Sequence, residues 1–292
     1  MQVQAKFLVI RFSSIGDIVL TTPVLRCLKE QFKGQVSIHF LTKRNFFPIL
    51  ENNPHIEKLH GIDKSTNEVM EDLIKEDFDF VIDLHNNLRS LRVKRKLKLA
   101  DLSFNKLNWE KWLKVNLKID KLPNEHIVDR YLATLKPWGV KADGKGLDYF
   151  LSDEVESIEL PVFFDNPYIA LTVGGGHATK TMPVDRLIAL IGKLGLGVVL
   201  LGGDEDTEKA KIIEKACNDK VWNACGKYSL SESALIVKKS ALVISHDTGL
   251  MHIAASFSKP IISIWGNTIP EFGMYPYMPQ CPERAAIIEV SD

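Results

Sequence analysis

The residues of this 292-residue sequence that could do chemistry gather in short loops after apolar runs. The first loop, Ser13–Asp17, follows the run Phe7–Phe12 and opens a helical stretch. Gly16 allows a close approach of the backbone, and the N-terminus of a helix attracts an anion. Asp17 would then offer a carboxylate that accepts a proton from a substrate hydroxyl. From spacing alone, a plain helix N-cap is the more frequent explanation of Asp17.

A glycine-rich loop, Gly174–Thr181, follows the apolar run Tyr168–Val173. It nearly matches the P-loop pattern G-x-x-x-x-G-K-[ST], but Thr179 stands at the second glycine, and Pro183 follows where a P-loop enters its helix. We interpret the loop as a different phosphate site, formed by backbone amides and a lysine charge. The residues concerned are Gly175, Gly176 and Lys180. A flexible turn between domains, with a surface lysine, is the alternative.

The most specific segment, Ser245–Ala255, leaves a strand, turns and enters a helix. The turn consists of Asp247, Thr248 and Gly249, and amides at the helix N-terminus can hold a diphosphate. His252 lies three residues after Gly249, about one helical turn on, and so can face the same ligand. A lone histidine in a helix is more often structural. Its combination with an Asp-Thr-Gly turn at a strand end favours a ligand-binding role.

Two acidic residues, Asp204 and Glu205, follow the run Val198–Leu201 and its two glycines. An acid just past a strand end can hold the hydroxyls of a ribose. Acids in the first turn of a helix also stabilise its dipole, so both roles stay open. Gly195 and Gly197 precede a strand instead of following one. The G-x-G-x-x-G fingerprint of dinucleotide-binding proteins is therefore absent.

A basic segment runs from Arg89 to Lys121 and contains eleven basic and three acidic side chains, a net charge of +8. Trp109 and Trp112 lie within it. Such a stretch suits an anionic partner, whether a phosphorylated lipid, a membrane surface or a nucleic acid. An ordinary solvated surface is the alternative.

Apolar strand-like runs alternate with helical patterns along the chain. The predicted strands are 7–12, 36–41, 78–83, 168–173, 198–201, 241–245 and 261–265, and the predicted helices are 18–32, 127–138, 183–194, 205–217 and 249–257. This alternation predicts the α/β class, with parallel sheets covered on both faces. Prolines interrupt it between Asp153 and Pro167, so we expect two domains, 1–160 and 161–292. A cleft at their strand C-termini would bind ligands.

Composition narrows the class of protein further. The formal net charge is zero, with 45% hydrophobic and 25% charged residues, which argues against a wholly basic nucleic-acid binder and against a disordered chain. The four cysteines are scattered and lie outside any zinc-ligand spacing, so we expect free thiols, a reducing compartment and no metal site. The apolar runs are too short for a signal peptide or a membrane span, which predicts a cytoplasmic protein.

Together, in this order, the loops resemble glycosyltransferase family 9, the ADP-heptose:lipopolysaccharide heptosyltransferases. The resemblance extends from Phe7 to about Gly266 and is strongest over Ile10–Pro23 and Asp247–Ala255. Asp83–Arg89, Thr179–Pro183 and Ile264–Thr268 also resemble family motifs.

The resemblance implies a GT-B fold, two Rossmann-like parallel-sheet domains facing a cleft, with the acceptor held by the first and the nucleotide sugar by the second. It implies that Asp17 is the base that deprotonates the acceptor hydroxyl. Acceptor-binding residues would be Ser14, Gly16, Arg89 and Arg92. Donor-binding residues would be Gly175, Gly176, Lys180, Asp204 or Glu205, Tyr228 near the adenine, Asp247, Thr248, Gly249 and His252. Transfer would invert the anomeric centre without a metal or cofactor, since the ADP-sugar is a co-substrate.

The implied acceptor is phosphorylated lipopolysaccharide inner core, and the basic segment would meet that acceptor or the anionic inner face of the inner membrane. We expect a monomer and no nucleic-acid partner. Family members usually continue further than the 40 residues that follow His252 here. We therefore expect either a trimmed C-terminus or a different closure of the cleft. A P-loop-like nucleotide hydrolase and a non-catalytic binder of sugar nucleotides or nucleic acid remain the alternative functions.

Overall fold

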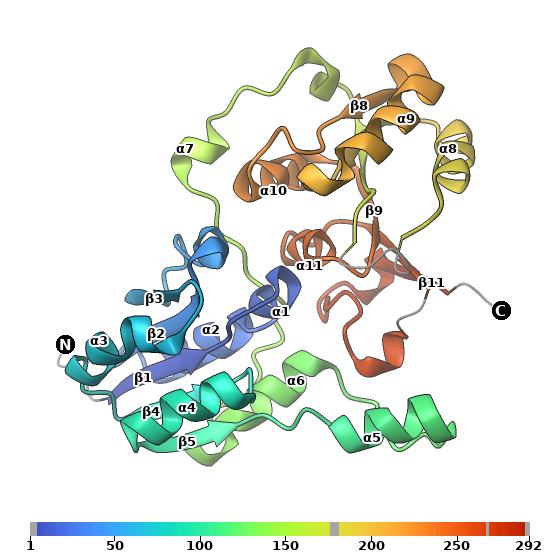
Figure 1. Ribbon diagram of the computed structural model, residues 1–292. Coiled ribbons are helices and arrows are strands. Elements are labelled where there is room, and N and C mark those ends of the chain that lie inside the picture. Colours follow the sequence, from blue (N-terminus) through green and yellow to red (C-terminus); the bar gives the residue numbers. More distant parts are fainter. Residues whose placement is uncertain (1–4, 176–180, 267–268, 290–292) are drawn as a thin grey trace. The chain divides into compact units, whose positions relative to one another are not determined.

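The computed structural model describes residues 5–175, 181–266 and 269–289, and the chain folds into two compact units. Unit 1 comprises Met1–Lys145 with Glu271–Gly273, and unit 2 comprises Gly146–Pro270 with Met274–Asp292. Each unit contains one parallel β-sheet with helices on both faces (Figure 1). The prediction of an α/β class with parallel sheets is confirmed.

The sheet of unit 1 has the strand order β3-β2-β1-β4-β5, and every neighbouring pair is parallel. Its strands are β1 Ala5–Ile10, β2 Val36–Lys43, β3 Lys58–Ile62, β4 Phe80–Asp83 and β5 Ala100–Ser103. The central strand β1 is buried from Phe7 to Ile10. A parallel strand covered on both faces needs such a continuous apolar run.

Helices cover both faces of this sheet (Figure 1). On one face, Leu73 and Val93 pack against Leu8 and Ile10 of β1. On the other, the ring of Phe7 contacts Phe32 and Trp138. The α-helices are α1 Ile15–Val19, α2 Thr22–Gln31, α3 Met70–Lys75, α4 Leu88–Leu97, α5 Asn108–Trp112 and α6 Ile127–Leu132. Arg44–Ile49, Thr66–Val69 and Ala133–Trp138 are 3-10 helices, and Leu113–Leu117 is a π-helix.

Two predicted helices of unit 1 are interrupted. The helix expected over 18–32 is split into α1 and α2, because Pro23 lacks an amide N–H and the hydroxyls of Thr21 and Thr22 donate to backbone carbonyls of the preceding turn. The helix expected over 127–138 is α-helical only to Leu132. It continues as a 3-10 helix that contains Pro137.

The sheet of unit 2 has the order β11-β10-β9-β6-β7-β8, again with every neighbouring pair parallel. Its strands are β6 Tyr168–Thr172, β7 Gly197–Leu201, β8 Val221–Asn223, β9 Leu242–His246, β10 Ile261–Trp265 and β11 Ala285–Glu289. The α-helices are α7 Asp153–Glu156, α8 Val184–Lys193, α9 Thr207–Cys217, α10 Leu230–Lys239 and α11 Gly249–Ser256. Short 3-10 helices span Val162–Asp165, Asp204–Asp206, Asn218–Lys220, Pro270–Phe272 and Pro282–Arg284.

The core of unit 2 follows from the apolar faces of its helices. Leu187 of α8 and Ile213 of α9 pack against Leu171 and Leu200 of the sheet. The hydroxyl of Tyr168 donates to the carbonyl of Ile236 in α10, 2.6 Å away. The four cysteines are free. No helix within the described ranges is long and apolar enough to cross a membrane.

Strand order marks one place in each sheet where ligands are expected. In unit 1, β1 lies between β2 and β4, and in unit 2, β6 lies between β7 and β9. The connections that leave two adjacent strands there run in opposite directions, so their loops diverge beyond the carboxyl ends of the strands. Ligands of open α/β sheets bind at such switch points. Ligand-binding residues are therefore expected in the loops that follow β1, β4, β6 and β9.

Candidate active site

Asp17 follows β1 in unit 1 and lies at the third position of α1, while Ser14 occupies the N-cap. The amide and hydroxyl of Ser14 donate to Asp17 Oδ2 over 3.1 and 2.9 Å. This is the return contact of a capping box, in which the third residue reaches back to the cap. The prediction that Asp17 is itself the N-cap is therefore wrong. Its carboxylate is instead oriented by Ser14, with 19% of the side chain exposed.

Arg11 holds the other oxygen of that carboxylate, with Nη2 2.7 Å from Asp17 Oδ1. The Arg11 guanidinium also donates to the carbonyls of Ser13 and Leu84 and to the hydroxyl of Tyr131, over 2.8, 2.6 and 2.9 Å. Burial by itself would raise the pKa of Asp17. The charge of Arg11 and the hydrogen bonds from Ser14 outweigh that effect and hold the pKa below its usual value. Asp17 is thus an ionised carboxylate in a fixed orientation.

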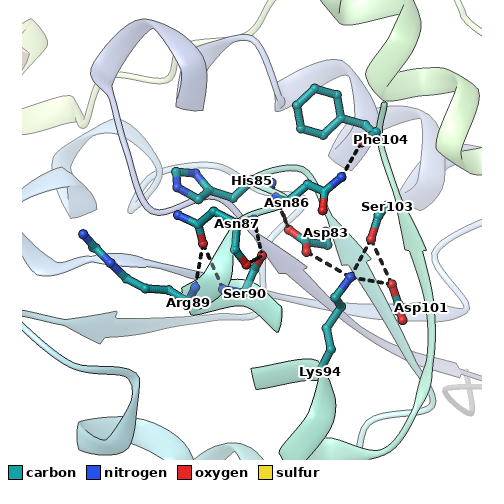
Figure 2. Close-up of polar contacts among 10 residues, drawn as sticks. All are labelled: Asp83, His85, Asn86, Asn87, Arg89, Ser90, Lys94, Asp101, Ser103 and Phe104. Atoms are coloured by element: carbon teal, nitrogen blue, oxygen red, sulfur yellow. Dashed lines mark hydrogen bonds and ion pairs between the residues drawn. The ribbon is translucent and has the colours of Figure 1, made fainter. Parts of the chain in front are cut away.

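The loop after β4 is held by a buried carboxylate at the end of that strand. Asp83 Oδ1 accepts hydrogen bonds from the amides of His85 and Asn86, over 3.0 and 2.7 Å. Its Oδ2 lies 3.2 Å from the ammonium of Lys94, which also contacts Asp101 (Figure 2). Asp83 therefore shapes the loop and pairs with a cation, in keeping with the cost of burying an isolated charge.

Arg89 and Arg92, two of the predicted acceptor-binding residues, lie on α4 directly after this loop, and both are exposed. The side-chain oxygen of Asn87 caps α4 by accepting from the amides of Arg89 and Ser90 (Figure 2). Of the other predicted acceptor residues, Ser14 is exposed and Gly16 is buried within α1.

Lys106 and Lys111, two residues of the basic segment, lie within electrostatic reach of Asp17, a proximity that the sequence did not predict. Burial and the charge of Arg11 lower the pKa of Lys106, and burial and the charge of Arg130 lower that of Lys111. Asp17 opposes the shift in both lysines. Burial, Arg11 and Lys106 also lower the pKa of His85 to about 4, so its ring is neutral at physiological pH. The carboxyl edge of the unit 1 sheet therefore carries several cationic side chains around the one carboxylate of Asp17. Such an edge attracts an anion.

Arg130 adds a second sign of an anionic ligand. Its side chain is only 7% exposed, and Nη2 donates to the carbonyl of Phe272 over 2.9 Å. Its Nε and Nη1 are buried and find no hydrogen-bond partner among the residues that the structure describes. A buried guanidinium is normally paired, because an unsatisfied charged donor is costly.

In unit 2, hydroxyl groups connect the ends of β6 and β9. Ser245 Oγ lies 2.9 Å from Thr172 Oγ1 and 3.0 Å from Thr248 Oγ1. Thr248 is the N-cap residue of α11, and Asp247, Thr248 and Gly249 are all partly exposed. The structure thus brings three predicted donor-binding residues to the carboxyl end of β9. His252, expected to face the same ligand, is 1% exposed and lies within the buried part of α11.

The acids after β7 differ in their surroundings. Asp204 and Glu205 are exposed, as a ribose-binding role requires. Asp206 instead folds back, and its Oδ2 accepts from the amide of Gly203 over 3.1 Å. Burial, and less strongly Glu205, raises the pKa of Asp206. Sequence reasoning named its two neighbours and missed Asp206.

The ends of the glycine-rich loop are fastened from two sides. Lys209 Nζ donates to the carbonyls of Val173 and Met182, over 2.8 and 3.2 Å. The amide of Met182 donates to His246 Nε2 over 2.9 Å. Gly175, which is partly exposed, follows this anchor. Gly176 and Lys180 lie outside the described residues.

Tyr228 lies in the turn that joins β8 to α10 and is partly exposed. The turn contains Gly226, whose φ of +67° suits glycine. The described donor-binding residues predicted from the sequence therefore follow β6, β7, β8 and β9, all at the carboxyl edge of one sheet. His252 lies one turn further along α11.

Solved structures with the same architecture define the class of this fold. A crystal structure of a family 9 glycosyl transferase from Veillonella parvula aligns with a TM-score of 0.80 at 23% identity, covering 100% of this chain and 88% of that one. Escherichia coli heptosyltransferase WaaC with ADP aligns with a TM-score of 0.74 at 20% identity, covering 98% of this chain and 93% of that one. The fold is that of GT-B glycosyltransferases.

The sequence comparisons identify the family. Residues 67–282 match the model of glycosyltransferase family 9 (heptosyltransferase), and the chain belongs to this family of enzymes. Lipopolysaccharide heptosyltransferase 1 of Campylobacter coli is 29% identical over 290 residues, covering 90% of this chain and 84% of that protein. Lipopolysaccharide heptosyltransferase 3 of Escherichia coli K12 is 26% identical, covering 87% of this chain and 80% of that protein.

The fit between Gly174 and Asp206 gives the first prediction. A Cβ added to Gly174 would stand 2.0 Å from Asp206 Oδ2, so Gly174→Ala must displace that carboxylate. We expect the free energy of unfolding to fall by about 1–3 kcal/mol, as for other overpacking substitutions. Urea unfolding measures it. Gly195→Ala is the matched control, because its Cβ would meet none of the described residues within 4 Å. Equal stability of the two variants would contradict the packing argument.

Proposed function

We propose that this enzyme transfers a heptose from an ADP-sugar to the inner core of lipopolysaccharide, with inversion and without a bound metal ion. The observation that carries the proposal is the ionised, oriented Asp17 carboxylate at the switch point of unit 1, surrounded by cationic side chains. The names of the relatives support the chemistry, since heptosyltransferases of lipopolysaccharide or lipooligosaccharide from several bacteria match most of the chain.

In the proposed reaction unit 2 binds the donor. The amides at the start of α11, next to Thr248 and Gly249, face the diphosphate, and Asp247 belongs to the same turn. Lys180, with Gly175 and Gly176, is proposed to contact phosphate. As ADP departs it gains negative charge, and these groups bind it more tightly in the transition state than in the ground state. Asp204 or Glu205 would hold the ribose, Tyr228 would contact the adenine, and His252 would support the turn.

Unit 1 is proposed to bind the acceptor. Asp17 accepts the proton of the attacking hydroxyl, and Ser14 and Arg11 fix the carboxylate for that transfer. Nε and Nη1 of Arg130, for which the described residues offer no partner, suit a phosphate or carboxylate of the acceptor, as do Lys106 and Lys111. Arg89, Arg92 and the backbone at Gly16 remain proposed contacts with the acceptor.

Of the two alternative functions, the nucleotide hydrolase loses support. Membership of a transferase family, together with Thr179 and Pro183 in place of the P-loop glycine and helix, argues against a nucleotide hydrolase. Magnesium-dependent ATP turnover in the purified protein would restore it. A non-catalytic binder would be favoured if sugar transfer were absent and salt-sensitive RNA or DNA binding were present.

A membrane contact is the second part of the proposal. Trp109 and Trp112 stack with ring centroids 5.2 Å apart and are 64% and 47% exposed. Val115, Leu117 and Ile119 add exposed apolar surface along the same segment, which also contains the exposed Lys118 and Lys121. Tryptophan next to lysine suits the interface of an anionic bilayer. We propose that Trp109–Lys121 contacts the cytoplasmic face of the inner membrane and that the enzyme acts there as a monomer.

The donor can be tested with a thermal-shift panel of ADP-, GDP- and UDP-sugars. ADP-heptose near 100-fold above its Kd is expected to raise the Tm by about 5 °C, because a ligand bound only by the folded state stabilises it. The other nucleotide sugars serve as controls and should leave the Tm unchanged. Stabilisation by a GDP- or UDP-sugar alone would refute the proposed donor.

The base assignment predicts that Asp17→Asn lowers the rate of sugar transfer by about 10²–10⁴-fold, because the amide cannot accept the proton. The Kd for the donor, measured by calorimetry, should stay unchanged, since Asp17 belongs to unit 1. Asp17→Glu keeps the charge beside Arg11 and moves the carboxylate by one methylene. The Asp17→Glu variant keeps the test decisive if Asp17→Asn unfolds the protein. Asp63→Asn, an exposed acid paired with Arg44, is the control. Full turnover of a folded Asp17→Asn variant would exclude the assignment.

The membrane contact predicts that replacing Trp109 and Trp112 together by Ala weakens binding to vesicles containing 30% phosphatidylglycerol by about five-fold or more, because interfacial anchoring depends on the apolar area buried. Co-sedimentation measures the effect. Ile212→Ala, which removes an equally exposed apolar side chain from α9 of unit 2, is the control. If both variants bind like the wild type, or if the wild type prefers neutral vesicles, the proposal is wrong.

A further inference from the structure

Two buried histidines and a carboxylate converge in unit 1, away from the loops described above. His39 Nδ1 lies 3.0 Å from His60 Nε2 and 3.8 Å from Glu76 Oε2. Each of the three side chains offers one possible ligand atom, and these atoms lie within 4.8 Å of one another. Within the part of the chain that the structure describes, no other group of three His, Cys, Asp or Glu residues meets this condition.

The strand register explains why the histidines meet. His60 of β3 pairs with Leu41 of β2, so His39 is its diagonal neighbour on the same face of the sheet. Glu76 follows α3 directly and precedes β4, which puts it at the amino edge of the sheet. Asp17 follows the carboxyl end of β1. The two histidines lie within β2 and β3 and Glu76 at the amino edge, so the group is separate from the candidate active site beyond the carboxyl ends of the strands.

The donor set matches a metal site in type and spacing. Burial lowers the pKa of both imidazoles, that of His60 to about 4, so each ring is neutral and has a lone pair to offer. Two histidine nitrogens bound to one tetrahedral zinc ion at ~2.0–2.1 Å stand roughly 3.3 Å apart. The observed 3.0 Å needs only a small shift. Two histidines and one glutamate, with a fourth position left for water, is a common zinc ligand set.

The surroundings favour a single geometry for these ligands. The ring of Phe78 packs edge-on against both imidazoles, with centroids 5.1 and 6.0 Å away. Glu76 is held by Lys58, at 2.5 Å, and by Lys6, at 3.3 Å. The hydrogen bond from Lys58 is the main cause that lowers the pKa of Glu76 to about 2, so the carboxylate is ionised. A metal ion would take the place of Lys6 at Oε2, while the exposed Lys58 keeps Oε1.

We propose that His39, His60 and Glu76 bind one divalent transition-metal ion, with zinc favoured by the ligand set, and that the ion ties β2, β3 and the end of α3 together. The ion would take no part in the sugar transfer, because its ligands come from β2, β3 and the end of α3 and not from the loop that carries the proposed base. It is therefore separate from the metal-independent transfer proposed above, and either proposal can fail alone.

The test uses the full chain after treatment with EDTA, with zinc chloride as the probe. Calorimetry should show saturable binding of one zinc ion per chain, and the Tm should rise by about 5 °C at high occupancy. Cobalt substituted for zinc should give visible d–d absorption bands. His60→Gln should abolish the saturable binding, and Glu76→Gln should weaken it by at least about 10-fold, because even the loss of an outer-shell partner of a metal ligand typically costs about 10–100-fold in affinity.

Glu71→Gln is the matched control, since Glu71 lies on α3, is exposed and is not part of the group. Glu76→Gln keeps the test decisive if loss of the buried imidazole of His60 unfolds the chain, because Glu76 is only partly buried. A direct hydrogen bond between the two imidazoles is the rival interpretation. It predicts no zinc-dependent shift of the Tm and no cobalt bands in the wild type. That result, or equal zinc affinity in wild type and Glu76→Gln, would overturn the proposal.

Discussion

The guanidinium of Arg11 is the contact on which the candidate active site of unit 1 depends. It is buried, pairs with Asp17, and donates to the carbonyls of Ser13 and Leu84 and to the hydroxyl of Tyr131. One side chain thereby joins the loop after β1, the loop after β4 and helix α6. Burial of a guanidinium is energetically costly unless its donors are satisfied. The hydrogen bonds of Arg11 therefore keep these three segments in one fixed arrangement.

In unit 2, a lysine and a histidine fix the two ends of the glycine-rich loop. Lys209 donates to carbonyls on both sides of the glycine-rich loop, and His246 accepts a hydrogen bond from the amide of Met182. Burial, and less strongly Lys209, lowers the pKa of His246 to about 4, which keeps Nε2 available as an acceptor. In both units, side chains that lie outside a loop fix its ends by hydrogen bonds. The loop itself is left to meet a ligand, as is usual where rigid elements carry binding residues.

Much of this could be predicted from the sequence, and the misses have physical causes. Continuous apolar runs identified β1 and β6, because parallel central strands are buried on both faces. The edge strands β3, β5 and β8 are short and partly polar, so no such run marks them. Asp17 was identified as a site residue because it follows a strand. The helix was predicted to begin one turn too late, so Asp17 was taken as the N-cap in place of Ser14. Arg130 was missed because the local sequence does not show that its Nε and Nη1 are buried without a partner among the described residues, and Asp206 because its close approach to Gly174 joins segments distant in sequence.

The environment of Asp17 raises a question that the proposed chemistry must answer. A cationic neighbour that keeps a carboxylate ionised also lowers its pKa, and a lower pKa makes a weaker base. The same cations act on the acceptor. A hydroxyl bound beside Arg11, Lys106 and Lys111 would lose its proton more easily, because they stabilise the developing alkoxide as they stabilise Asp17. Proton transfer depends on the difference between the two pKa values. If the acceptor oxygen lies among these cations, they orient Asp17 and bind the acceptor without removing the driving force for proton transfer.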